Sequence, residues 1–86
     1  MTGAHPLIHI QIEYFALFRE MAGCGQELVE TKAVDALALY EEVRERHAFT
    51  LEPGRIKVAI NDEFSDWDTA LVDGDRIVFI PPVAGG

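Results

Sequence analysis

The stretch AVDALALYEEVRERHA, residues 33–48, carries the pattern that decides the fold. Its apolar and aromatic side chains recur at intervals of three and four residues, while Glu and Arg side chains occupy the opposite side, which predicts an amphipathic helix. The apolar stripe consists of Ala33, Ala36, Tyr40, Val43 and His47, flanked by Leu37 and Leu39. A helix with a single apolar side must bury that side, so we expect it to lie across one face of a sheet.

Strand-like segments flank this helix on both sides. Residues 7–15, LIHIQIEYF, alternate between apolar and polar side chains, as a half-buried strand does. Further strands are expected over 27–32, 56–60 and 76–80, and a short helix over 16–23. The order strand, short helix, strand, long helix, strands predicts an α+β fold, the ubiquitin-like β-grasp, with a mixed sheet packed against one main helix. Periodicity alone does not separate this fold from other small α+β rolls.

Polar residues and glycine mark the expected turns. NDE (61–63) predicts a hairpin turn, and DGD (73–75) predicts a tight turn in which Gly74 supplies a positive φ. The paired acids of such turns usually accept local backbone hydrogen bonds, so we interpret Asp73 and Asp75 as turn residues.

Length and charge limit the classes of function. Eighty-six residues make one domain, and the net charge of −8 argues against a nucleic acid or an anionic membrane as partner. The charge favours a partner with a basic surface, although it could serve solubility alone. No apolar run approaches the roughly 18 residues of a membrane span, and no secretory signal is visible, so we expect a cytoplasmic protein.

Residues for conventional catalysis or metal binding do not form a pattern. Cys24, the single cysteine, lies between two glycines and is expected to be exposed, but no nearby residue would activate it. His5, His9 and His47 lack the spacing of metal ligands. His47 is interpreted as a residue at the C-terminus of the helix. We therefore expect no metal site and no cofactor.

The chain ends in IPPVAGG, residues 80–86. Pro81 and Pro82 lack N–H groups, so they cannot extend the last strand, and they direct the chain outward in an extended form. We expect a β-grasp domain over 1–80 and an extended tail over 81–86 that reaches roughly 20 Å.

The last two residues, Gly85 and Gly86, have no side chains, so they can enter a narrow slot. A free carboxylate is inert, but ATP-dependent adenylation would make the terminal carboxylate an acyl donor. A tail that ends in glycine by chance is the alternative interpretation.

Two segments carry a specific resemblance. YFALFRE (14–20) and INDEFSDWDTALVDGDRIVFIPPVAGG (60–86) resemble the small subunits of molybdopterin synthase, the MoaD family of ubiquitin-like sulfur carriers. The second match covers the turn at Asn61, Leu71 and the whole tail, whereas residues 24–55 match only in pattern.

The resemblance implies a chemical role for the end of the chain. In this family an activating enzyme related to the ubiquitin-activating enzymes adenylates the terminal glycine, here Gly86, which then becomes a thiocarboxylate. The sulfur passes to a cyclic pyranopterin precursor, and two transfers build the dithiolene that holds molybdenum or tungsten. The carrier is a non-catalytic subunit of a heterotetramer, active only with the large synthase subunit.

The resemblance also implies which residues contact the partners, which are the large subunit and the adenylyltransferase. The tail residues Pro81, Pro82, Val83, Ala84 and Gly85 would enter the partner's active site. Two further positions, Phe64 and Ile80, match the family's hydrophobic docking face. Ordinary core packing remains an alternative for these two side chains.

Other carriers share the same activation step. The chain could carry sulfur for thiamine or cysteine synthesis, although thiamine carriers usually lack a segment like residues 15–23 and the Pro-Pro pair. It could also be a ubiquitin-like modifier that is joined to protein lysines through Gly86.

Overall fold

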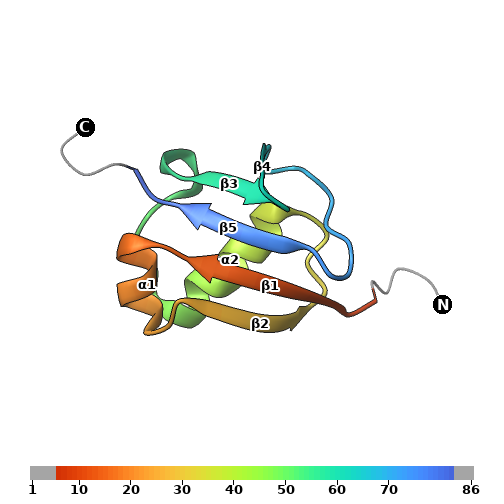
Figure 1. The fold of residues 1–86 in the computed structure, drawn as a ribbon, viewed down its shortest axis with the longest axis horizontal. Helices are drawn as coiled ribbons and strands as arrows, with labels where there is room; N and C mark the ends of the chain where they lie inside the picture. Colours follow the sequence, from red (N-terminus) through yellow and green to blue (C-terminus); the bar gives the residue numbers. More distant parts are fainter. Residues whose placement is uncertain (1–5, 83–86) are drawn as a thin grey trace.

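A computed structural model of the chain describes residues 6–82. The elements in chain order are β1 (Ile8–Tyr14), α1 (Ala16–Ala22), β2 (Gln26–Thr31), α2 (Ala36–His47), a 3₁₀ turn (Pro53–Arg55), β3 (Lys57–Ile60), β4 (Glu63–Ser65) and β5 (Arg76–Ile80). The five strands form one sheet in the order β2-β1-β5-β3-β4, in which only β1 and β5 are parallel. Helix α2 lies across one face of this sheet (Figure 1). This arrangement is the ubiquitin-like β-grasp, as predicted.

Helix α2 begins later than the predicted residue 33. Asp35 is the N-cap, with its side chain accepting a 2.9 Å hydrogen bond from the Ala38 amide. The amide of Ala33 instead donates to the Thr31 hydroxyl at 3.0 Å, which holds the chain before the helix. Leu37, expected to flank the apolar stripe, is 40% exposed. The buried side of α2 consists of Ala36, Leu39, Tyr40 and Val43.

Aromatic side chains fill the space between α2 and the sheet. The ring of Tyr40 lies 5.1 Å from that of Phe79 and 6.0 Å from that of Phe18, centroid to centroid. The Tyr40 hydroxyl donates a 2.7 Å hydrogen bond to the carbonyl of Leu51, which satisfies a polar group that burial would otherwise isolate. Burial also raises the pKa of Tyr40 to about 12. Tyr40 therefore fixes both the core and the loop that follows α2.

The two predicted turns are present. Asn61 and Asp62 both have positive φ, 52° and 73°, and form the two-residue turn between β3 and β4. The Asn61 side chain donates to Asp75 and accepts from the Arg76 amide, each at 2.9 Å. Gly74 has φ 91° in the turn before β5. These bonds join the hairpin firmly to the start of β5.

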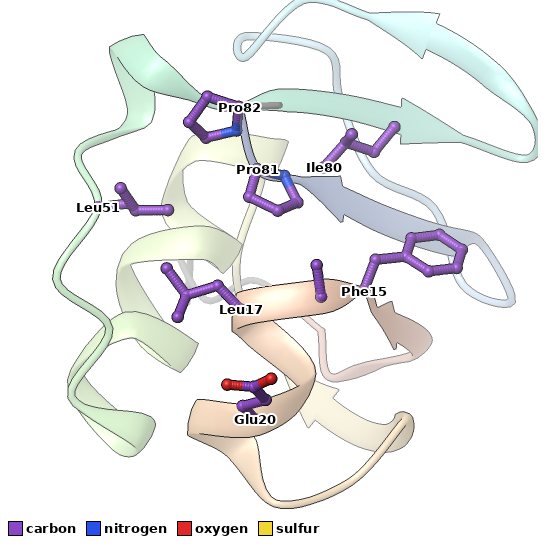
Figure 2. A pocket seen from close by; sticks show the side chains of 8 residues that line it. Phe15, Leu17, Glu20, Leu51, Ile80, Pro81 and Pro82 are labelled. Atoms are coloured by element: carbon purple, nitrogen blue, oxygen red, sulfur yellow. The ribbon is translucent and has the colours of Figure 1, made fainter. Parts of the chain in front are cut away.

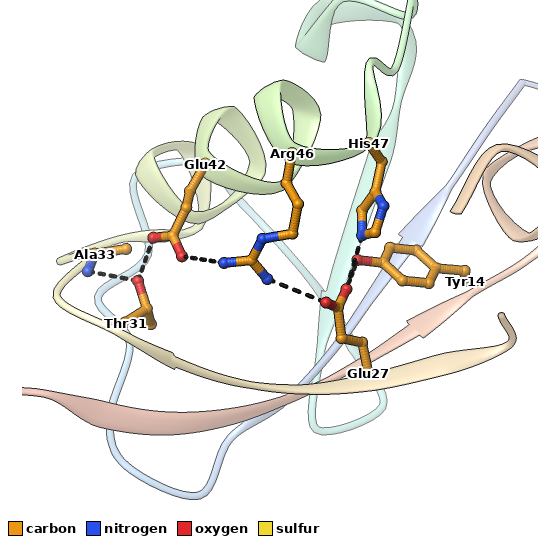
Figure 3. Close-up of polar contacts among 7 residues, drawn as sticks. All are labelled: Tyr14, Glu27, Thr31, Ala33, Glu42, Arg46 and His47. Atoms are coloured by element: carbon orange, nitrogen blue, oxygen red, sulfur yellow. Dashed lines mark hydrogen bonds and ion pairs between the residues drawn. The ribbon is translucent and has the colours of Figure 1, made fainter. Parts of the chain in front are cut away.

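A polar network ties the C-terminal end of α2 to strands β1 and β2 (Figure 3). The Glu27 carboxylate accepts from the Tyr14 hydroxyl at 2.7 Å, lies 2.9 Å from His47 Nε2 and accepts from Arg46 at 3.1 Å. Arg46 also meets Glu42 at 3.4 Å, four residues earlier on the same side of the helix. Burial raises the pKa of Glu27, but the three hydrogen bonds outweigh it and hold the pKa below its ordinary 4.5.

Replacing Ala48 with glycine should stabilise the protein. Ala48 ends α2 with φ 58°, a left-handed conformation that costs a residue with a Cβ roughly 1–2 kcal/mol. Glycine avoids this cost but loses roughly 0.5–1 kcal/mol through its freer unfolded chain. We expect a net gain of about 0.5–1 kcal/mol in the free energy of unfolding, measured by urea denaturation. The control, Ala38→Gly inside the helix, should destabilise by about 1 kcal/mol, and a loss at both positions would contradict the expected cap strain.

The Glu27 network should give the protein a pH-dependent stability. Because the folded-state pKa of Glu27 is lowered, its contribution is present above the unfolded pKa near 4.5 and is lost as pH falls through the folded value. Glu27→Gln should cost about 1–2 kcal/mol at neutral pH, and this difference should shrink in acid. Urea denaturation at several pH values measures it. Glu30→Gln on the same strand alters an exposed pair, so it should change stability by less than about 0.5 kcal/mol. An equal loss for both variants would contradict the role of the network.

Candidate functional site

The sheet face turned away from α2 is partly apolar. Side chains alternate along each strand, so Ile12, Val58 and Phe79 point toward α2 while their neighbours point away. On the outer face, Val78 stands beside Ala59, which in turn stands beside Phe64. Together with Ile80 and Phe15 they form what we call the apolar patch, whose members are Phe15, Ala59, Phe64, Val78 and Ile80.

Phe64 projects from this patch into solvent. Its side chain is 74% exposed, whereas Ala59 and Val78 beneath it are each 8% exposed. The rigid turn at Asn61 determines the register that sets Phe64 against Ala59. Phe64 therefore does not belong to the core, and exposed aromatic side chains of this kind are typical of protein interfaces.

A charged cluster bounds the patch along the same face. Arg76 lies on the outer side of β5, where its guanidinium meets Glu13 of β1 at 3.2 Å and also contacts Asp62 in the β3–β4 turn. The side chain of Arg76 thereby links three segments, namely β5, β1 and the β3–β4 turn. It gives the apolar patch a defined polar edge, as in interfaces with an apolar centre and a polar rim.

A groove of about 670 Å³ continues the patch toward the C-terminus (Figure 2). We call it the tail-base groove, because Pro81 and Pro82 form part of its wall. Its other apolar lining comes from Phe15, Ala16, Leu17, Leu51 and Ile80, and within the described part of the chain Glu20 is its one charged lining residue. The patch and the groove share Phe15 and Ile80, so together they form one apolar surface that leads to the tail.

Backbone strain occurs in the wall of this groove. Ala16 has φ 48°, which is uncommon for a residue with a Cβ. This conformation turns the chain sharply from β1 into α1, so that Phe15 and Leu17, before and after the turn, both line the groove. Strained residues of this kind gather at functional sites, where the surrounding structure holds them.

The structure brings four of the predicted site residues together. Phe64 and Ile80 lie on the same outer face, and Pro81 and Pro82 follow directly from β5. The remaining predicted residues, Val83, Ala84, Gly85 and Gly86, lie outside the described residues.

Sequence reasoning missed Phe15, which is 49% exposed beside Ile80. A signal for it was present. In the alternation of residues 7–15 Phe15 shares the register of His9, Gln11 and Glu13, so it is an aromatic residue on the polar side of the strand.

The expectation that Cys24 is exposed is wrong. Its side chain is partly buried and packs against the core, because the turn from α1 into β2 folds it inward. Of the three histidines, His5 lies outside the described residues. His9 meets Asp73 at 3.0 Å and Glu30 at 3.1 Å at the other end of β1, and His47 belongs to the Glu27 network. Within residues 6–82, no three His, Cys, Asp or Glu side chains converge as ligands of one metal ion would.

Neither α1 nor α2 could cross a bilayer, and the described part of the chain has no helix of sufficient length and apolar character to do so.

Comparison with known proteins finds a family model that matches this chain and sulfur carrier subunits that are similar to it. The model of the ThiS family matches residues 12–86. The molybdopterin synthase sulfur carrier subunit of Escherichia coli (strain K12) is 35% identical over 80 residues, which cover 90% of this chain and 99% of that protein.

Solved structures agree with these sequence matches. A putative molybdopterin converting factor, subunit 1, from Pyrococcus furiosus superposes with a TM-score of 0.73 at 29% identity, covering 88% of this chain and 99% of that chain. Another match, with a TM-score of 0.64 at 28% identity, comes from the protein-protein complex of subunits 1 and 2 of the molybdopterin-converting factor from Helicobacter pylori 26695. It covers 92% of this chain and all of that one.

Proposed function

Because the chain belongs to the ThiS family, we propose that it is the sulfur carrier subunit of a molybdopterin synthase and works in the cytoplasm. The observation that carries the proposal is the apolar surface that runs from Phe64 to Pro81 and Pro82 at the base of the tail. A carrier needs such a surface, because its partner must hold the domain while it receives the end of the chain. The names of the similar proteins support the same function.

The proposed chemistry takes place at the carboxylate of Gly86. An oxygen of this carboxylate attacks the α-phosphorus of ATP on an activating enzyme, and pyrophosphate leaves. Sulfur at the oxidation level of sulfide, delivered by a sulfur donor, then displaces AMP from the acyl adenylate, which gives a thiocarboxylate. The thiocarboxylate sulfur then bonds to a carbon of a cyclic pyranopterin precursor in place of an oxygen substituent, and water cleaves the acyl–sulfur bond, which leaves the sulfur on the precursor and returns the carboxylate. The dithiolene of molybdopterin contains two sulfur atoms, so two loaded carriers are consumed for each product.

The proposed tail consists of residues 81–86, which follow a β-grasp domain over residues 1–80. Pro81 and Pro82 keep the tail from pairing with the sheet. Ala84 has a small side chain and Gly85 and Gly86 have none, so these residues suit a narrow channel. A tail of this length can reach roughly 20 Å into a partner. The domain therefore stays outside the partner's active site while its last atoms react inside it.

Two partners follow from this chemistry. One is an adenylyltransferase related to the ubiquitin-activating enzymes, and the other is the large synthase subunit, with which the carrier forms a heterotetramer. The complex of subunits 1 and 2 known for the similar Helicobacter pylori protein supports the second partner. We assign docking to the apolar patch, with Phe64 and Ile80 as predicted from the sequence and with Phe15 added from the structure.

Phe64→Asp should separate docking from folding. Phe64 is an exposed side chain, so its replacement should leave thermal stability within about 0.5 kcal/mol of the wild type. It should weaken binding to the large subunit by about 2 kcal/mol or more, as measured by calorimetry. Leu28→Asp is the matched control, because Leu28 is 81% exposed on edge strand β2, away from the patch. If both variants bind equally well, the patch is not the docking surface.

Deleting Gly86, or adding one residue after it, should abolish sulfur transfer and leave the melting curve unchanged. One residue of extended chain shifts the reacting carbon by about 3.3 Å, whereas a misplacement of about 1 Å can cost on the order of 100-fold in rate. Pyrophosphate release and thiocarboxylate formation with the activating enzyme measure the effect. Full activity of the deleted chain would show that Gly86 is not the reacting group.

Intact-mass analysis of the protein purified from its own host distinguishes the proposed function from protein modification. A carrier shows the replacement of one oxygen by sulfur, whereas a modifier appears as a conjugate of much larger mass.

A further inference from the structure

Glu20 is a carboxylate set in an otherwise apolar groove. Among the groove-lining residues within 6–82 it is the only charged one, and it is exposed on α1. Some acidic side chains of the described region are paired, such as Glu13 with Arg76 and Glu27 with Arg46, whereas others, such as Glu45, are unpaired and exposed. Glu20 forms no ion pair with any residue between 6 and 82. The neighbouring Arg19 lies beside the backbone of Gly25 instead.

The lining of the groove indicates the kind of side chain that fits it. In Figure 2 Glu20 lies at one end of the row formed with Leu17, Pro81 and Pro82. A purely aliphatic occupant would remove water from the carboxylate without giving it a partner, which is costly. An acidic occupant would be repelled. A long side chain with an apolar stem and a cationic end satisfies both parts of the groove.

Arginine fits this description better than lysine. Its guanidinium is more weakly hydrated than an ammonium group, and its two parallel donors match the two oxygens of a carboxylate. Its flat end can also stack on an aromatic ring, and Phe15 lines the same groove.

The position of the groove indicates which protein supplies the arginine. The groove shares Phe15 and Ile80 with the apolar patch, and Pro81 and Pro82 with the tail. A protein that covers the patch and encloses the tail must therefore pass over the groove. The net charge of −8 also favours a partner whose facing surface is basic.

We propose that the tail-base groove binds an arginine side chain of the large synthase subunit, with its stem between Leu17 and Pro81 and its guanidinium on Glu20. This inference rests on the proposed function. It adds a charge-specific contact at the point where the tail leaves the domain. The contact fixes the direction in which the tail enters the partner, which contact through the apolar patch alone does not do.

The test is calorimetric binding of the full chain to the large subunit from the same organism, at low and at physiological ionic strength. Glu20→Lys should raise Kd by about thirtyfold or more, as expected when one charge of a desolvated pair is removed. Glu20→Gln keeps the shape and one hydrogen bond, so Kd should rise about three- to tenfold. The control is Glu45→Lys, the same charge change at an exposed position of α2 that lies outside the groove, and it should stay within about twofold.

A charge exchange identifies the partner residue. Each arginine of the large subunit is replaced by glutamate, and one of these variants should bind wild-type carrier weakly but restore binding to Glu20→Lys. If no arginine behaves in this way, or if Glu20→Lys binds as tightly as Glu45→Lys, the inference is wrong. Melting curves check that each carrier variant folds. If Glu20→Lys does not fold, Glu20→Gln takes its place in the binding comparison.

The Phe64→Asp variant distinguishes a failure of the proposed arginine contact from a failure of the proposed function. If Phe64→Asp weakens binding while Glu20→Lys does not, the carrier function stands and the groove has another role. If the wild-type chain does not bind the large subunit at all, the proposed function fails and this inference fails with it.

Discussion

A single helix can cover only one face of a five-stranded sheet, and this constraint shapes the rest of the molecule. Helix α2 takes the face that carries Phe79, and Tyr40 fixes it there through aromatic contacts and a hydrogen bond to the following loop. The side chains that face α2 are almost fully buried and form the core cluster. The outer face is therefore free to differ from the core in composition, and it carries both a charged cluster and an apolar patch.

The contrast between the covered and the outer face of the sheet explains how much of the fold could be predicted from the sequence. Period-two alternation and the helical stripe gave the elements, because both report which side of each element is buried. The turn at Asn61 was predictable because its residue types suit a positive φ. The start of α2 was misplaced because Val34 and Ala33 continue the apolar pattern, whereas the cap at Asp35 depends on its own hydrogen bond.

The candidate site was only partly visible in the sequence. Phe64 and Ile80 stand next to a turn and to two prolines, so their positions could be interpreted locally. The tail-base groove could not be foreseen, since it brings together α1, the loop at Leu51 and the end of β5. Its shape also depends on the positive φ of Ala16, which no residue type signals. Surfaces assembled from distant segments in this way require the tertiary structure.

The place of β5 within the sheet has a mechanical consequence. The strand is paired on both sides, with β1 parallel to it and β3 antiparallel. The hydrogen bonds of these pairs run across the strand direction, so tension applied along the tail loads many of them at the same time instead of opening them one by one. Force applied at the C-terminal end of β5, as the proposed partner would apply it, should therefore leave the shape of the domain unchanged. The sheet thus holds the base of the tail in place through both neighbours of β5.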